Sequence, residues 1–303
     1  MLNIIILIAG FVMLIKGADT FVDSASSIAK KFGIPSIIIG MTIVAMGTSA
    51  PELSVSINSS LSGMNDMSIA NVVGSNLFNL LVVLGVSSLL GKLKITNYKD
   101  VIVLLCCSLI LALFTLNGTL SLIEGLILLS IFAWFIFSMI QQAKNNNEEM
   151  DEIKQKPLSL TIVLGIIGLA AIVWGGDLVV TAASAIATQL GMSENLVGLT
   201  VVAVGTSLPE LVTSVMATKK GELDIAVGNV IGSNIFNILL IIGCASVIHP
   251  MTVSIFAIID TLVVFTVTSL FIVLTNKTKE ITKKIGIPMI LIYIIYMIIT
   301  IIR

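Results

Sequence analysis

The sequence predicts an all-α membrane protein whose ten transmembrane helices form two inverted-topology repeats of five. Composition is the first reason. Hydrophobic types make up 57% of the 303 residues and charged types only 11%, and the mean hydropathy is +1.13. A soluble domain carries about 25% charged residues, so the exterior of this chain must face lipid. Soluble enzymes and nucleic-acid-binding proteins are therefore excluded, and a formal net charge of −1 offers no basic surface for nucleic acid.

Ten apolar stretches have the length that is needed to cross a bilayer, which is about 20 residues for a helix. The predicted spans are residues 2–29, 35–60, 67–90, 99–116, 120–141, 158–188, 194–217, 224–247, 252–275 and 284–302. The first and sixth are long and carry polar residues in their second halves, which favours a tilt or partial shielding from lipid. The charged stretch 142–157 is a linker between a first repeat, residues 1–141, and a second, residues 158–303.

Basic residues predict the orientation, because Lys and Arg collect in cytoplasmic loops. With the N-terminus outside, 14 of the 16 basic residues fall in the loops of the inner side. The outer loops, near 61–66, 117–119, 189–193 and 248–251, contain none. The sequence therefore predicts a multi-pass membrane protein with both termini outside.

The chain repeats itself at a fixed offset of 158 residues. Residues 40–59 lie over 198–217 with 11 of 20 positions identical, and residues 71–80 lie over 229–238 with 7 of 10 identical. Apolar composition alone would not match Gly, Thr, Ser, Pro, Glu and Asn in register. Because five spans is an odd number, the second half enters the membrane from the opposite side. Inverted repeats are typical of secondary transporters, which bind their substrate near the midplane between the repeats.

Each repeat carries an acidic residue in the middle of a span: Glu52 within GTSAPE (47–52) and Glu210 within GTSLPE (205–210). Ionisable residues inside a membrane are costly and mark function by default. The proline before each glutamate removes a backbone donor and should bend the helix. Unpaired carbonyls are tolerated at this depth only where they line a cavity or meet an ion. The carbonyls expected to lose their helical partners are those near Ala45, Gly47, Thr48, Ala203, Gly205 and Thr206.

The polar groups of these motifs are hard oxygen ligands. They are the carboxylates of Glu52 and Glu210, the hydroxyls of Thr48, Ser49, Thr206 and Ser207, and the amides of Asn79 and Asn237. Oxygen cages suit Ca²⁺ or Na⁺, whereas Mg²⁺ dehydrates reluctantly and softer metals prefer imidazole or thiolate. Two carboxylates neutralise one divalent ion, which offsets the cost of burying charge. Because Ca²⁺ and Na⁺ are close in size, one set of ligands can hold either ion by turns, which is the physical basis of exchange.

A second motif, GSN-x-F-N, begins another span in each half, at residues 74–79 and 232–237. Ion ligation is favoured for its last residue, Asn79 or Asn237. Packing of small residues with amide hydrogen bonds between helices is favoured for Gly74, Gly232, Asn71 and Asn229. Asp19 and Asp177 also match under the repeat, and the sequence leaves open whether they line an ion path or cap a helix.

Two copies of G-T-S-x-P-E, each followed by G-S-N-x-F-N in the next span, resemble the alpha repeats of the sodium/calcium exchanger family, within the cation/calcium exchanger superfamily. The resemblance implies a ten-helix antiporter, not an enzyme, that exchanges several Na⁺ for one Ca²⁺ electrogenically by alternating access. Ca²⁺ and Na⁺ are then the transported ions, no organic cofactor is implied, and the long first and sixth helices slide across the rest. The implied metal ligands are Glu52 and Glu210 at the centre, with Thr48, Ser49, Thr206, Ser207, Ser75, Asn79, Ser233, Asn237 and the backbone oxygens of Ala45 and Ala203.

Two features depart from relatives in that family. Asn237 stands where some members, including the potassium-dependent branch, carry Asp, which argues against K⁺ co-transport and leaves the charge balance for bound Na⁺ open. The linker 142–157 is too short for the large cytosolic calcium-sensing domains of animal exchangers, so we infer a prokaryotic plasma-membrane protein without that regulation. Ca²⁺, Na⁺ and the lipid bilayer are the expected partners, and no protein partner is evident, in keeping with a monomer.

Three other classes were weighed against this interpretation. A proton/calcium exchanger of the same superfamily is the nearest, because buried carboxylates can titrate, but those relatives lack the doubled G-T-S-x-P-E form. A cation channel is disfavoured because channels usually build their pores from symmetric subunits. An intramembrane protease is disfavoured because the sequence has no H-E-x-x-H, no G-x-G-D and no Ser/His pair on its spans.

Overall fold

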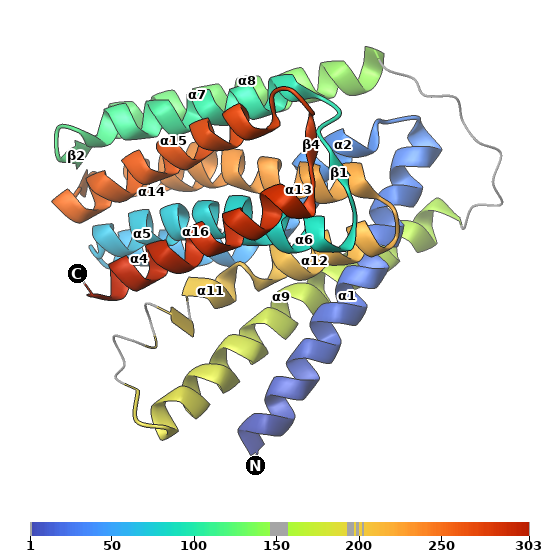
Figure 1. Ribbon diagram of the computed structural model, residues 1–303, viewed down its shortest axis with the longest axis horizontal. Helices are drawn as coiled ribbons and strands as arrows, with labels where there is room; N and C mark the ends of the chain where they lie inside the picture. The colour runs from blue at the N-terminus through green and yellow to red at the C-terminus, as the bar shows by residue number, and fades with distance from the viewer. Residues whose placement is uncertain (1, 146–156, 193–196, 198–199, 202, 303) are drawn as a thin grey trace.

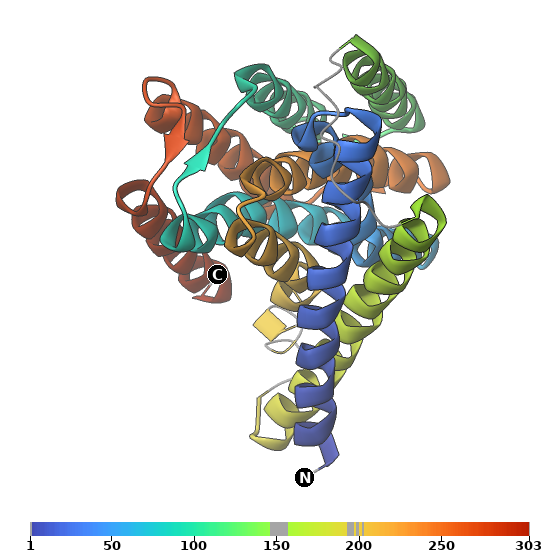
Figure 2. The ribbon, with the colours of Figure 1, turned by 90° about the vertical axis from the view of Figure 1, so that its right-hand side faces the viewer.

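The computed structural model describes residues 2–145, 157–192, 197, 200–201 and 203–302. Two long helices, α1 (Leu2–Phe32) and α9 (Leu158–Gln189), lie side by side and run obliquely to the remaining helices (Figure 1; Figure 2). At 1.5 Å per residue each is about 45 Å long, which exceeds the bilayer core of about 30 Å. The expected length of the first and sixth spans is therefore confirmed, whereas their tilt in the membrane stays a prediction.

Glycines bring α1 and α9 into backbone contact. A Cβ atom added to any of them would come within 2.8–2.9 Å of a backbone atom of the opposite helix, so no larger residue fits there without a shift. The two pairs are Gly10 with Gly175 and Gly17 with Gly168. The offset of 158 turns one pair into the other, so the contact is reciprocal between the halves.

The second predicted span is broken, as its proline indicates. It consists of α2 (Ser36–Ile39), the π-helical turn η1 (Gly40–Val44), α3 (Ala45–Thr48) and α4 (Ala50–Leu61). The parts on either side of Ser49 are bent by 49°. In the second half, α11 (Ala203–Thr206) and α12 (Leu208–Lys219) are separated in the same way at Ser207.

Two spans form the centre of the molecule. The first consists of α5 (Asn65–Phe78), η2 (Asn79–Val83) and α6 (Leu84–Leu90), and the second of α13 (Leu223–Phe236), η4 (Asn237–Ile242) and α14 (Gly243–Ile248). Between 72% and 78% of their apolar windows are buried, against 17% for the last helix of the chain, so the core lies along these two spans.

The outer layer consists of α7 (Tyr98–Thr115), α8 (Leu122–Asn145), α15 (Ile255–Thr275) and α16 (Lys283–Ile302) (Figure 1). Two short antiparallel ladders tie the halves together. In one, β1 (Leu93–Lys94) pairs with β4 (Glu280–Ile281), and in the other β2 (Thr119–Leu120) pairs with β3 (Met251–Thr252). The helix α8 ends at Asn145, so the first residues of the predicted linker, 142–145, are helical instead; the rest of the linker up to residue 156 lies outside the described residues.

The part of the chain that the structure describes has eight helices long and apolar enough to cross a membrane, or nine if the bent pair Ser36–Thr48 and Ala50–Leu61 is one span. The predicted span 194–217 includes residues outside the described ranges. The all-helical membrane fold is therefore confirmed, whereas the count of ten spans stays a prediction.

Candidate ion-binding site

Glu52 and Glu210 lie at the start of α4 and α12, directly after the prolines that bend their spans. Neither side chain has any exposed surface. The first turn of a helix favours a negative charge, because its unpaired backbone N–H groups point toward it. The helix breaks thus supply part of the stabilisation that a buried carboxylate needs.

Each carboxylate is also held by a hydroxyl of the other half. Ser49 Oγ donates to Glu210 Oε1 at 2.9 Å, and Ser207 Oγ donates to Glu52 Oε1 at 3.0 Å. Ser75 Oγ adds a second bond to Glu52 Oε1, at 3.2 Å. Hydrogen bonds to a charged acceptor are among the strong ones, so these contacts brace the two breaks against each other.

The asparagines of the second motif meet at the centre of the molecule. Asn76 Nδ2 donates to Asn234 O at 3.2 Å, and Asn234 Nδ2 donates to Asn76 O at 3.1 Å. Asn79 and Asn237, both fully buried, are the first residues of the π-helical turns η2 and η4. Such turns occur often at functional sites, and no sequence pattern predicted them.

Several buried polar atoms at this centre have no hydrogen-bond partner among the described residues. They include Glu52 Oε2, Glu210 Oε2, Asn237 Oδ1 and both Oδ1 and Nδ2 of Asn79. Leaving buried polar groups unpaired is costly and rare, so free oxygens converging in one place indicate a site for a hard cation. Among the described residues, no three His, Cys, Asp or Glu side chains lie in an arrangement that could hold a metal ion.

The other predicted ligands gather around the same place. Thr48 and Ser233 lie beside the Glu210 carboxylate, and both are buried. Thr206 is 8% exposed at the end of α11, next to the fully buried Ser207. The structure therefore places five of the predicted hydroxyls, those of Ser49, Ser75, Ser207, Thr48 and Ser233, at the two carboxylates.

The expectation for the backbone carbonyls of the first break is wrong in one respect. Ala45 O keeps a helical partner, the N–H of Ser49 at 3.0 Å, and the N–H groups that cap α3 also reach Gly47 O. The reason is that Ala45 O pairs with the N–H of the residue four positions on, Ser49, whereas Pro51 removes only the donor that would reach Gly47 O. Two hydroxyls also lie within reach of Ala45 O, Thr48 Oγ1 at 3.3 Å and Ser233 Oγ at 3.4 Å. Because a carbonyl oxygen has two lone pairs, Ala45 O can serve a ligand only where these hydroxyls donate elsewhere.

Asn71 and Asn229 hold the backbone of the two breaks. Asn71 Nδ2 donates to Glu52 O at 3.1 Å and to Ser56 Oγ at 2.9 Å. In the second half, Asn229 Nδ2 donates to Glu210 O at 3.4 Å and to Ser214 Oγ at 2.9 Å. Amide bonds between helices were predicted, whereas the serines were missed, although Ser56 and Ser214 match under the offset of 158 and so carried a signal.

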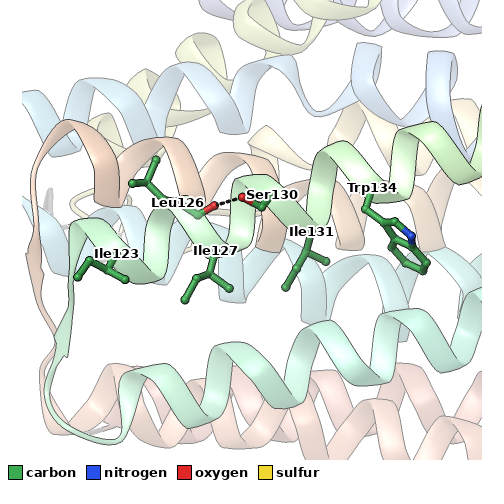
Figure 3. Close-up of a pocket in the computed structure, with 6 residues that line it drawn as sticks. All are labelled: Ile123, Leu126, Ile127, Ser130, Ile131 and Trp134. Atoms are coloured by element: carbon green, nitrogen blue, oxygen red, sulfur yellow. Dashed lines mark hydrogen bonds between the residues drawn. The ribbon is translucent and has the colours of Figure 1, made fainter.

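Two other features lie apart from this site. Asp19 forms an ion pair with Lys220, with its Oδ1 2.8 Å from Nζ, and Asp177 is exposed on α9. A hollow on the outer face of α8 is lined by Ile123, Leu126, Ile127, Ser130, Ile131 and Trp134 (Figure 3). The hydroxyl of Ser130 bonds to Leu126 O within the same helix. The rest of the lining is apolar, so this hollow suits contact with lipid chains and not the binding of an ion.

A family model described as sodium/calcium exchanger protein matches residues 2–141 and 160–302. The chain belongs to the sodium/calcium exchanger family. This exchanger is 33% identical to the sodium/calcium exchanger MaX1 of Methanosarcina acetivorans, with 98% of each chain covered. It is 35% identical to the inner membrane protein YrbG of Escherichia coli, over 81% of this chain and 79% of that protein. The family consists of membrane transporters, so a multi-pass transport protein is confirmed.

Comparison with solved structures also finds members of the exchanger family. A structure of the sodium-calcium exchanger NCX_Mj, soaked with 10 mM Na⁺ and 10 mM Sr²⁺, matches this exchanger with a TM-score of 0.87 at 31% identity, over 97% of each chain. A second structure of NCX_Mj, soaked with 2.5 mM Na⁺ and 0.1 mM Ca²⁺, matches with a TM-score of 0.86. Fold and family therefore agree.

Proposed function

We propose that this exchanger moves Ca²⁺ out of the cell in return for Na⁺, by alternating access. One observation carries the proposal. Glu52 and Glu210 are each hydrogen-bonded through one oxygen to a serine of the other half, while the second oxygen has no hydrogen-bond partner among the described residues. Membership of the exchanger family supports the same assignment.

The transported ion binds between the two halves in this proposal. Two carboxylates carry two negative charges, which one Ca²⁺ neutralises. Exchange of one Ca²⁺ for more than two Na⁺ would move net charge across the membrane. Hydroxyl and amide oxygens complete the coordination that a hard cation requires. The proposed ligands are Glu52, Glu210, Thr48, Ser49, Thr206, Ser207, Ser75, Ser233, Asn79, Asn237 and the backbone oxygens of Ala45 and Ala203.

Alternating access follows from an inverted repeat of five spans in each half, residues 1–141 and 158–303, with both termini outside. The duplicated contacts support this architecture: the glycine pairs of α1 and α9 match at the offset of 158, and each of the two ladders joins a strand of the first half to a strand of the second. The helices α1 and α9 form the unit that slides across the core and exposes the site to one side at a time.

Coupling to Na⁺ without K⁺ is the expected mode. Asn237 contributes a neutral amide, so the site has two carboxylates for Na⁺ or Ca²⁺ and no third acid for a further cation. A monomer in the plasma membrane is sufficient for this mechanism, because both halves of the site come from one chain.

The test is uptake of radioactive Ca²⁺ by Na⁺-loaded proteoliposomes in Na⁺-free medium. Parallel samples receive K⁺, or a pH gradient in place of the Na⁺ gradient. We expect uptake that requires internal Na⁺ and is unchanged by K⁺. Uptake that follows the pH gradient would assign the protein to proton-coupled exchange, and uptake without any counter-ion would indicate a channel.

A further inference from the structure

Asn229 links the two halves of the site through all of its polar atoms. It lies on α13, fully buried, and its Nδ2 bonds to Glu210 O and Ser214 Oγ in the second half. Its Oδ1 accepts a hydrogen bond from Thr48 Oγ1 in the first half, at 3.1 Å. Packing alone would use the volume of the amide but would not require this acceptor.

The hydroxyl of Thr48 has one proton and a choice of acceptors. Besides Asn229 Oδ1, it lies 3.3 Å from Ala45 O, 3.5 Å from Ser233 Oγ, and beside the Glu210 carboxylate. A hydroxyl donates once and accepts through two lone pairs. The acceptor that takes the proton therefore decides which oxygens keep their lone pairs for a cation.

We infer that Asn229 is a positioning residue of the ion site: it takes the Thr48 proton, so that Thr48 Oγ1 faces the ion as an acceptor. Ala45 O and the Glu210 carboxylate are then spared from receiving that proton. The amide cannot easily rotate to present Nδ2 instead, because both of its N–H groups are engaged by Ser214 Oγ and Glu210 O. The inference rests on the proposed function, since it takes Thr48 as an ion ligand.

The orientation matters because a cation repels a hydroxyl proton that points toward it. Without Asn229, the Thr48 proton turns to Ala45 O or Glu210, each of which is a proposed ligand. Asn229→Ala should therefore weaken ion binding by about tenfold, the scale of one hydrogen bond to a charged centre. Ser214→Ala, which removes one anchor of the amide, should weaken it by about threefold, the scale of a neutral hydrogen bond.

Equilibrium binding of radioactive Ca²⁺ to the purified full-length protein in Na⁺-free detergent buffer tests this inference. The variants are Asn229→Ala, Thr48→Ala, the double variant, and Ser214→Ala, each checked for folding by thermal unfolding. Asn58→Ala is the matched control, because Asn58 is exposed on α4 and bonds only to Ser54 among the described residues. Because Asn229 acts through Thr48, we expect the double variant to bind within about twofold of the weaker single variant.

Two results would overturn the inference alone, provided that the wild type binds Ca²⁺. The first is an unchanged Ca²⁺ affinity of Asn229→Ala. The second is a loss of affinity in the double variant that equals the product of the two single losses. Absence of Ca²⁺ binding by the wild type would overturn the proposed function, and the inference with it. If Asn229→Ala does not fold, the cycle of Ser214→Ala with Thr48→Ala gives the answer. A loss of Ca²⁺ affinity in that double variant smaller than the product of the two single losses supports the inference, and a loss equal to the product overturns it.

Discussion

The two halves of this exchanger match at the proposed ion site and differ where the long helix α1 meets the core. At the site, Ser49 with Glu210 and Ser207 with Glu52 are the same contact at the offset of 158. At the turn between α12 and α13, Lys220 Nζ lies 2.8 Å from Asp19 Oδ1 and 2.5 Å from Asp23 Oδ1, and Glu222 Oε1 lies 3.0 Å from Lys30 Nζ. We call this group of ion pairs the α1 joint.

Four of the five charged residues of the α1 joint have no charged equivalent in the other half, and the fifth, Asp19, corresponds to the exposed Asp177. Under the offset of 158, Lys220 and Glu222 correspond to Ser62 and Met64, while Asp23 and Lys30 correspond to Thr181 and Thr188. The comparison teaches that two properties constrain the repeat differently: the binding of an ion, and the choice of the membrane side to which the site opens. The proposed ion lies between the halves and takes ligands from both, whereas a protein that opens to two sides can favour one side through a contact that only one half makes.

The largest expected effect comes from removing either carboxylate. Glu52→Gln and Glu210→Gln should each abolish Ca²⁺ transport, at least 100-fold below wild type, because each leaves a single negative charge for a divalent ion. Transport of Ca²⁺ into proteoliposomes measures this. An equal loss of Ca²⁺ transport in the two variants would be the clearest sign that the two carboxylates contribute equally to the site.

Glu124→Gln serves as the control for that experiment. Glu124 Oε2 accepts from the N–H and hydroxyl of Ser121 at the start of α8, and glutamine supports this cap as well. It should transport normally. Normal transport by either Glu52→Gln or Glu210→Gln would remove the central claim about the site.

The sequence named candidate site residues but not the details of the fold around them, for a physical reason. Buried acids beside proline and glycine in an apolar span have few structural explanations, so Glu52, Glu210 and their neighbours could be assigned from the motifs alone. The π-helical turns at Asn79 and Asn237 depend on packing between spans, which no local pattern records. The Ala45 carbonyl kept its helical partner because one residue decides where a helix ends, a detail finer than a motif resolves.

Polar contacts between residues far apart in the sequence likewise could not be predicted from the repeat. Asp19 matched Asp177 in the repeat, which suggested a shared role, but Asp19 pairs with Lys220, about 200 residues away in sequence, and Asp177 is exposed. The charges of the α1 joint are ordinary surface residues by composition. Only the folded arrangement of α1 against the turn after α12 shows that they meet.

A smaller effect is expected from the serines that cross between the halves. Ser49→Ala and Ser207→Ala each remove one hydrogen bond to a buried carboxylate, so each should raise the half-saturating Ca²⁺ concentration by about tenfold. Saturation curves for Ca²⁺ uptake measure the change. The two values should agree within about threefold, the context dependence usual for one type of hydrogen bond. A tenfold difference between them would show that the symmetry of the contacts does not extend to their energies.

The smallest effect is expected at the α1 joint. Its ion pairs are partly exposed, so Lys220→Ala should weaken the contact between α1 and the turn after α12 by about 1 kcal/mol or less. If the joint lies on the cytoplasmic side, as proposed, it favours the state in which that side is closed. The variant should then change the ratio of half-saturating Ca²⁺ concentrations at the two faces by about threefold, measured in inside-out and right-side-out vesicles. Lys219→Ala is the matched control, because Lys219 is exposed and forms no ion pair among the described residues.

The pH dependence of the same variant separates the joint from the ion site. Partial burial lowers the pKa of Lys220, but its hydrogen bonds to Asp19 and Asp23 outweigh this and raise the pKa above the ordinary 10.5. A lysine with a raised pKa contributes fully below its ordinary value and loses the contribution as pH rises through the raised one. The difference between wild type and Lys220→Ala should therefore stay constant from about pH 7 to 9. A difference that fades within that range would mean that the joint acts through a group other than Lys220.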